Sequence, residues 1–263
     1  MPADAVPIGR GGRPTTEWRL IPLETVSAAW AMALEEVLVE GVATGGLPTL
    51  RFWRWDPSAA TIGRFQDVDA EVDLEYCHLH GIDVVRRMSG GGAVFHDGEG
   101  EFVYSLTVPE GMFPKGVVEA YSAVLDLVIA GLAKLGVEGW VKDDNNLMVG
   151  DGKVSGNSQR RSRDVLQVHG TVLVDALEDT MFSVLKARAG EPSETRATPS
   201  RHHPVAGLRA LCDATYDEAY MAVKGALLGS GPSVATSWTE TELTMAEGLV
   251  ATKYGDDRWN LVL

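Results

Sequence analysis

The sequence is poor in the features that mark several common protein classes. Only two cysteines occur among its 263 residues, Cys77 and Cys212, and they lie far apart and form no C-x-x-C pair. This argues against a disulfide framework and a zinc site. No apolar run approaches the roughly 18 residues of a membrane span, and the N-terminus lacks the basic and apolar segments of a secretory signal. We therefore expect a cytoplasmic protein that does not enter the membrane, with both thiols reduced and buried.

Positive charge is also scarce. The net charge is −14, because 23 Lys and Arg residues stand against 37 Asp and Glu residues. Binding along nucleic-acid phosphates requires a basic surface, so we expect no broad binding to nucleic acid. The hydrophobic fraction of 45% and the charged fraction of 23% are ordinary for a globular protein and argue against long disorder.

Hydrophobic periodicity predicts an α/β protein of the α+β type, in which helices flank a mixed, largely antiparallel sheet. Residues 1–16 are expected to form a flexible leader and 17–263 a single domain. The segment 58–62 is expected to form a hairpin with 49–55 through Asp56-Pro57. The predicted strands are 18–23, 49–55, 58–62, 82–86, 93–96, 101–108, 137–141, 146–149, 152–159 and 164–174. The predicted helices are 26–40, 73–80, 115–135, 179–187, 215–228 and 240–254, with a long surface loop at 190–206.

The stretch R-R-M-S-G-G-G-A-V-F-H-D at 86–97 stands out, since two arginines and three glycines lead into an apolar tail. Glycines let main-chain N–H groups approach a ligand closely, and Arg86 and Arg87 carry permanent positive charge. The stretch is therefore typical of a loop that binds an anion. Taken alone, it is equally consistent with a hairpin turn beside a solvated arginine pair.

Two later segments bear on that choice. Lys153 lies in G-D-G-K-V-S-G-N-S-Q, between a turn and a strand, and an ammonium in one pocket with the glycine loop suits a carboxylate and a phosphate together. In Q-V-H-G-T-V-L-V-D, the strand contains His169 and Gly170, and Gly170 is expected where a ligand approaches the backbone. His169 alone is more typical of a hydrogen-bonded core histidine.

These three motifs in this order resemble the lipoate-protein ligase A family, which has the biotin and lipoate protein ligase fold. The resemblance covers nearly the whole chain, from W-R-L-I-P-L-E-T to K-Y-G-D-D-R-W-N. It implies an enzyme that activates lipoate with ATP and Mg²⁺ to lipoyl-AMP and then transfers the lipoyl group to a lysine of a carrier domain. The implied carriers are the lipoyl domain of a 2-oxoacid dehydrogenase, the glycine-cleavage carrier protein or a similar domain. No tightly bound prosthetic group and no metal ligand are implied.

The resemblance also assigns roles to individual residues. Lys153 would hold the carboxylate and the α-phosphate during catalysis, which is electrostatic stabilisation of the transition state. Contacts to ATP or the adenylate are implied for Arg87, Gly92, Ala93, Val94, Phe95, His96, Asn146 and Lys153. Contacts to lipoate are implied for Ser89, Gly90, Gly91, Lys153, Arg160, His169 and Gly170.

Two departures from the family pattern matter. Many of its ligases carry an Asp where Asn146 stands, and Asp143 or Asp144 could take over its role. The chain ends at Leu263 without the small accessory domain of single-chain ligases. We therefore expect a catalytic domain that needs a separate accessory subunit to form the adenylate and that transfers from supplied lipoyl-adenylate.

Three other functions compete with this one. An octanoyl or lipoyl transferase of the relay type shares the fold but forms a thioester on a cysteine, and residues 140–146 contain no cysteine. A second alternative is a non-catalytic module that binds lipoate or its adenylate and needs a partner or has lost activity, and the presence of Lys153 argues against loss of activity. A biotin ligase would carry a G-R-G-R-x-G-R type of loop, which the sequence lacks.

Overall fold

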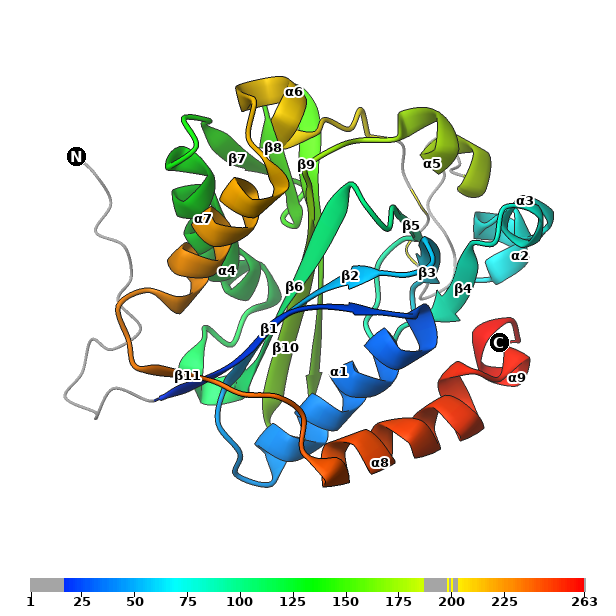
Figure 1. The fold of residues 1–263 in the computed structure, drawn as a ribbon, viewed down its shortest axis with the longest axis horizontal. Helices are drawn as coiled ribbons and strands as arrows, with labels where there is room; N and C mark the ends of the chain where they lie inside the picture. The colour runs from blue at the N-terminus through cyan, green and yellow to red at the C-terminus, as the bar shows by residue number, and fades with distance from the viewer. Residues whose placement is uncertain (1–16, 187–197, 199, 201–202, 263) are drawn as a thin grey trace.

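The computed structural model describes residues 17–186, 198, 200 and 203–262, so the leader expected at 1–16 lies outside the described residues. An eight-stranded sheet runs through the molecule and a three-stranded sheet lies beside it (Figure 1). The strands are β1 (Trp18–Val26), β2 (Thr49–Trp55), β3 (Ala59–Ile62), β4 (Asp83–Arg86), β5 (Val94–His96), β6 (Glu101–Pro109), β7 (Gly139–Lys142), β8 (Asn146–Val149), β9 (Gly152–Ser162), β10 (Val165–Leu173) and β11 (Ser233–Ala235). The helices are α1 (Ala28–Ala43), α2 (Val68–Glu71), α3 (Leu74–Leu79), η1 (Glu110–Met112), α4 (Val117–Ala133), α5 (Glu178–Val184), α6 (Leu208–Cys212), α7 (Tyr216–Leu228), α8 (Glu240–Leu249), η2 (Val250–Tyr254) and α9 (Asp257–Asn260).

The large sheet is mixed and largely antiparallel, as predicted. Its strand order is β11-β1-β2-β6-β10-β9-β8-β7. β1 runs parallel to both β11 and β2, and every later neighbour in the order is antiparallel. The predicted fold class is therefore confirmed.

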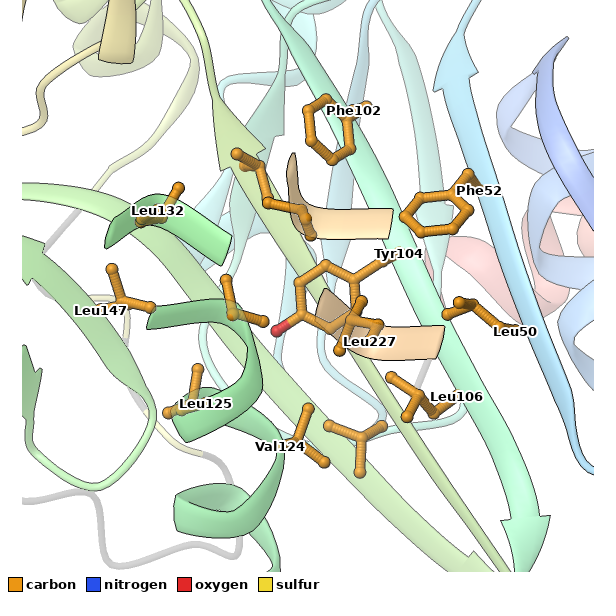
Figure 2. Close-up of a cluster of buried hydrophobic side chains, with 14 of the residues drawn as sticks. Leu50, Phe52, Phe102, Tyr104, Leu106, Val124, Leu125, Leu132, Leu147 and Leu227 are labelled. Atoms are coloured by element: carbon orange, nitrogen blue, oxygen red, sulfur yellow. The ribbon is translucent and has the colours of Figure 1, made fainter. Parts of the chain in front are cut away.

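Both faces of the central strand β6 are buried, although three of the four residues on one face, Glu101, Ser105 and Thr107, are polar. Phe102, Tyr104 and Leu106 point to one face, because successive side chains on a strand alternate. There they pack against α4 and α7, and Figure 2 shows Tyr104 in the middle of the cluster, with Leu125 of α4 and Leu227 of α7 among the labelled side chains around it. This cluster is the main hydrophobic core.

The opposite face of the sheet is covered by α1. Val103 of β6 and Trp53 and Trp55 of β2 pack there against Ala28 and Met32. In Figure 1 helix α8 runs alongside α1, and the two helices are in contact. This second, smaller core forms one wall of the cavity described below.

The three-stranded sheet has the order β4-β3-β5, with β3 parallel to β4 and antiparallel to β5. The predicted hairpin between 49–55 and 58–62 is therefore wrong. β2 is already paired on both edges, with β1 and with β6, so it has no free edge for β3. As a result β3 crosses to the second sheet, and the glycine loop between β4 and β5 closes over the large one.

Some predicted boundaries also change. β9 continues to Ser162, so Arg160 and Arg161 belong to the strand and the turn lies at Arg163 and Asp164, both left-handed. The helix predicted at 240–254 ends in a five-residue π-helical turn, η2. In the predicted loop 190–206, Val205 forms a bridge to Lys153. The pattern missed α2, η1, α6, α9 and β11. None of the described helices has the length and apolarity needed to cross a membrane.

Candidate active site

A cavity of about 270 Å³ lies where the glycine loop meets β2, β6, β9 and β10 of the large sheet. One wall is apolar and consists of Met32, Trp53, Trp55 and Val103. The other walls are polar or main chain. They consist of Thr61, Arg87, Gly91, Gly92, Ala93, Val94, His96, Asp143, Asn145, Asn146, Lys153, Gly156, Asn157, Ser158, His169, Gly170, Thr171, Thr198, Ser200 and His203. A volume near the lower end of ligand sites, with one apolar wall and convergent polar groups, fits a small amphipathic molecule.

Arg87 holds the glycine loop in shape. Its side chain is buried, and Nη2 donates to the carbonyl oxygens of Gly90 and Gly92 at 2.7 Å each. Nη1 donates to the carbonyl and hydroxyl oxygens of Thr61, and Nε donates to Ser89 Oγ. These bonds use all five N–H donors of the guanidinium. Burial lowers the pKa of Arg87 to about 10, so the group remains a cation at neutral pH.

Two glycines of the loop, Gly91 and Gly92, line the cavity with main-chain atoms. Gly91 has φ +93°, in the left-handed region that favours glycine. Within the described ranges, the main-chain N–H groups of Gly91 and Gly92 donate to no acceptor. Because the Arg87 charge lies directly behind them, these N–H groups form a site that favours a negative ligand.

Lys153 enters the same cavity from β9. Its backbone is fixed on both sides, since its N–H donates to Pro204 O at 2.7 Å and its carbonyl accepts from Ala206 N at 3.0 Å. Burial, together with the nearby Arg87 charge, lowers the pKa of the Lys153 ammonium to about 8. In the part of the chain that the structure describes, no carboxylate pairs with Nζ. The ammonium is therefore available to an anionic ligand.

A buried ion network supports His169 from behind. Its Nε2 lies 3.0 Å from Ser89 Oγ and its Nδ1 lies 3.4 Å from Glu35 Oε2. Glu35 also accepts from Arg51 at 3.2 Å and from Ser105 at 2.7 Å. Burial would raise the pKa of Glu35, but the hydrogen bond with His169 and the Arg51 charge outweigh it and hold the pKa below its usual range. His169 is thus a hydrogen-bonded histidine that also faces the cavity.

His96 forms a second buried network. Its Nδ1 lies 2.6 Å from Glu101 Oε1 and its Nε2 lies 3.0 Å from the Thr61 hydroxyl, which also accepts from Arg87. Its ring packs on Trp55, whose indole N–H donates to Glu101. Burial raises the pKa of Glu101, and the pairing with His96 offsets only part of that effect. This network fixes the Trp55 side of the apolar wall.

The structure places most of the predicted residues at the cavity. Those that line it are Arg87, Gly91, Gly92, Ala93, Val94, His96, Asn146, Lys153, His169 and Gly170. At Gly170 an added methyl group would lie 1.9 Å from Asn157 Oδ1. Glycine is therefore needed there for the Asn157 side chain, which Tyr104 also contacts by hydrogen bond.

Four predicted residues lie outside the cavity lining. Phe95 is buried in the small core around Cys77 and Ile62, because side chains on β5 alternate. Gly90 turns its carbonyl oxygen to Arg87 and Ser158. Ser89 and Arg160 line an adjacent cavity of about 10 Å³, together with Met32, Glu35, Glu36, Arg87, Met88, Gln167, His169 and Tyr254.

Several site residues are not among those predicted from the sequence motifs. Trp53 and Trp55 lie in the predicted strand 49–55, and nothing in the strand pattern shows that their face borders a cavity. Ser158 donates to Gly90 O at 2.8 Å, and Ser200 accepts from Ala93 N at 2.8 Å. Both hydroxyls hold the glycine loop by hydrogen bonds from segments distant in the sequence. Ser158 stands in the lysine motif, so its place in the site could have been predicted, whereas no motif contains Ser200.

Neither cysteine is placed to form a covalent intermediate at the described lining. Cys77 is buried in α3, and burial raises the pKa of its thiol to about 11. Cys212, on α6, donates its S–H to Leu208 O. Among residues 17–186, 198, 200 and 203–262, no group of three His, Cys, Asp or Glu side chains is arranged to hold a metal ion.

Comparison with known proteins gives consistent results. Residues 27–228 match the family model of the lipoyl protein ligase A/B catalytic domain. The chain is 32% identical to octanoyltransferase LipM of Symbiobacterium thermophilum over 94% of this chain and 98% of that protein. It superposes on a lipoate-protein ligase A bound with ATP with a TM-score of 0.80 and 25% identity, covering 94% and 99% of the two chains. A bi-partite lipoate protein ligase from Thermoplasma acidophilum, studied with its lipoyl domain, shares the fold with a TM-score of 0.79 and 24% identity, covering 95% and 98%.

Proposed function

Since the chain belongs to the lipoyl protein ligase A/B catalytic-domain family, we propose that it attaches a lipoyl-type acyl group to a lysine of a carrier domain through an acyl-adenylate. The observation that carries this proposal is the composition of the cavity. Among the described residues, it combines a buried ammonium that has no carboxylate partner, main-chain N–H groups that have no acceptor, and an apolar wall, and neither cysteine lines it. The acyl chain of an acyl-adenylate suits the apolar wall, and its acyl and phosphate oxygens suit the ammonium and the N–H groups.

In the first step, a carboxylate oxygen of the acid attacks the α-phosphorus of ATP, and the bond to pyrophosphate breaks. The acyl chain would lie against Met32, Trp53 and Trp55, where apolar surface leaves water. Lys153 would hold the carboxylate and the α-phosphate together, since both are anions and a compact ammonium can contact two oxygens. The N–H groups of Gly91 and Gly92 would bind phosphate oxygens.

In the second step, the carrier lysine, as a neutral amine, attacks the acyl carbon. AMP leaves, and the amine proton passes to solvent. Negative charge grows on the acyl oxygen and the departing phosphate, so the Lys153 ammonium stabilises this transition state as well. No protein nucleophile is needed, because the adenylate is already activated and positioning supplies much of the remaining rate.

Mg²⁺ would enter with ATP as part of the substrate and neutralise the departing pyrophosphate. The chain contributes few hard oxygen ligands of its own to the described lining. Asp143 is the carboxylate that borders the cavity, and the amides of Asn145 and Asn146 lie next to it. A metal ion carried by phosphates therefore fits this site better than a resident one.

A second candidate function is octanoyl transfer through an acyl-cysteine, favoured by the similarity to octanoyltransferase LipM. It needs an activated thiolate at the cavity. The structural argument against it is the position of both thiols, since Cys77 is buried with a raised pKa and Cys212 lies on α6.

A cysteine-free variant separates the two functions. We would incubate wild-type and Cys77→Ala/Cys212→Ala protein with a lipoyl carrier domain, a candidate accessory subunit, ATP, Mg²⁺ and either lipoate or octanoate, and follow carrier acylation by mass spectrometry. The proposal predicts equal rates for both proteins and dependence on ATP. ATP-independent transfer from an octanoyl donor that the cysteine-free variant loses would overturn it in favour of the relay.

A parallel assay with preformed lipoyl-adenylate measures transfer alone. Comparing it with the ATP assay, each with and without a candidate accessory subunit, also tests the expected need for such a subunit. Carriers from a 2-oxoacid dehydrogenase and from glycine cleavage would define the partner.

A further inference from the structure

The segment from Val250 to Asn260, which comprises η2 and α9, binds the stem of the glycine loop. Trp259 donates its indole N–H to Arg86 O at 2.9 Å, and Arg86 returns a bond from Nε to Trp259 O at 3.0 Å. The main-chain N–H of Arg86 donates to Asn260 Oδ1 at 3.1 Å, and its Nη2 donates to Asn260 O at 3.2 Å. We call residues 250–260 the C-terminal clamp. It lies beyond the matched family model, which ends at residue 228.

A lysine in the clamp reaches the loop itself. Lys253 Nζ donates to Glu36 Oε2 at 2.6 Å and lies 3.2 Å from Met88 Sδ, inside the glycine loop. Its ammonium stacks on the Trp259 ring at 4.3 Å, and Tyr254 donates to the same Glu36 oxygen. The π-helical turn of η2 brings these two neighbouring side chains to one carboxylate of α1, and such turns are frequent at functional sites.

The clamp also supports the turn on which the loop rests. Arg86 Nη1 donates to Gln66 O at 2.6 Å and to Gly63 O at 3.2 Å, while Arg64 stacks on Trp259. Arg64 N in turn donates to Ser89 O at 2.9 Å, within the loop. Arg86 is fully buried among these partners. It is therefore committed to the clamp, whereas its neighbour Arg87 turns to the cavity.

We propose that Trp259 and Lys253 are positioning residues for the glycine loop, which they hold in the conformation that presents the Gly91 and Gly92 N–H groups. Neither side chain lines the described cavity, so both act through Arg86 and Met88. The link to adenylate binding rests on the proposed function. The link to loop order does not.

The test compares Trp259→Phe, which keeps an aromatic ring and removes the indole N–H, and Lys253→Met, which keeps the length and removes the charge. Hydrogen exchange measured by mass spectrometry reports on the order of residues 86–92 and does not depend on enzyme activity. Each variant should speed exchange in this segment about fivefold, the effect of one lost hydrogen bond. Lys253→Arg should retain the slow exchange. Glu247→Gln, on the exposed side of α8, is the matched control.

A second readout is binding of a non-hydrolysable lipoyl-adenylate analogue. Its dissociation constant should rise about fivefold in both variants, while the Tm stays within a few degrees of wild type. Unchanged exchange in 86–92 overturns the positioning role, even if the enzyme is active. Exchange that rises equally throughout the chain also overturns it, because it shows general destabilisation. Faster local exchange with no analogue binding in any protein, including wild type, keeps the clamp and removes the proposed function.

Discussion

The glycine loop and the lysine strand face each other across one cavity, but they are built in opposite ways. In the loop, Arg87 donates all its N–H groups to oxygens of Thr61, Ser89, Gly90 and Gly92, so its hydrogen-bond donors are already satisfied before a ligand binds. On β9, Lys153 has a fixed backbone and an ammonium with no carboxylate partner in the described structure. One cation maintains the shape of the site, and the other is left for the ligand. Changes that affect one role and spare the other test this division.

The largest effect on activity is expected from Lys153→Met. Removing a cation that stabilises the transition state should lower kcat/KM for carrier acylation by about 100- to 1000-fold. The free energy of unfolding should not fall, since the ammonium is desolvated without a partner. Steady-state kinetics and denaturant unfolding of one preparation measure both. Equal loss of stability and activity would contradict the division.

Arg87→Lys should do the reverse and mainly cost stability. Lysine keeps the charge but cannot reproduce the planar fork, so buried carbonyls in the loop lose their donors. We expect the free energy of unfolding to drop by about 2 to 4 kcal/mol. Urea titration measures it, with Arg163→Lys as the control, because the Arg163 pair with Glu40 is exposed. A drop no larger than that of the control would refute the structural role of Arg87.

The pH dependence should reveal Lys153 separately from Arg87. The pKa of Lys153 is about 8, so its charge is lost above pH 8, while Arg87 keeps its charge up to about pH 10. Acylation should therefore fall about tenfold per pH unit above pH 8, after correction for the carrier amine. Stability should instead rise between pH 8 and the usual lysine pKa, because the unfolded chain binds more protons there. A stability that falls in this window, or that rises equally in Lys153→Met, would contradict the assignment.

The smallest effect is expected from a pair of glycine substitutions. A methyl group at Gly156 would lie 2.8 Å from Lys153 Nζ and displace the ammonium, whereas one at Gly90 would meet no atom within 4 Å. We expect Gly156→Ala to lower kcat/KM by about tenfold, since a small misplacement of a catalytic group is costly. Gly90→Ala should change it by less than about twofold. Kinetics that place the two variants in the opposite order would show that the loop, and not the lysine, sets the geometry.

The sequence predicted the motifs of the site better than it predicted their roles. Lys153 and Asn146 stand on predicted strands next to recognisable turns, His169 stands inside a predicted strand, and all three reach the cavity. Arg86 and Arg87 look equivalent in the sequence, yet alternation along the chain at the end of β4 sends one to the clamp and the other to the cavity. Hydrophobic periodicity shows that successive side chains alternate, but it does not show which of the two faces borders the cavity.

Long-range pairing limited the prediction of the fold. The strand content was largely right, but β3 joins the second sheet because β2 has no free edge, and a local turn cannot reveal that. Ser200 enters the site by a bond to Ala93, more than a hundred positions earlier. Such contacts depend on the assembled sheet, whereas single-sequence patterns describe only neighbouring residues.

The bonds between Arg86 and the C-terminal clamp have a consequence for how the protein is made. Their partners are separated by 173 and 174 positions. At translation speeds of about 5 to 20 residues per second, the loop leaves the ribosome roughly ten seconds or more before Trp259 and Asn260 do. Once residue 203 has been synthesised, and until Trp259 follows, the nascent chain contains every side chain that lines the described cavity, but not the contacts that secure its glycine loop. We therefore expect the site to reach its final order only after the helical end of the chain has been synthesised.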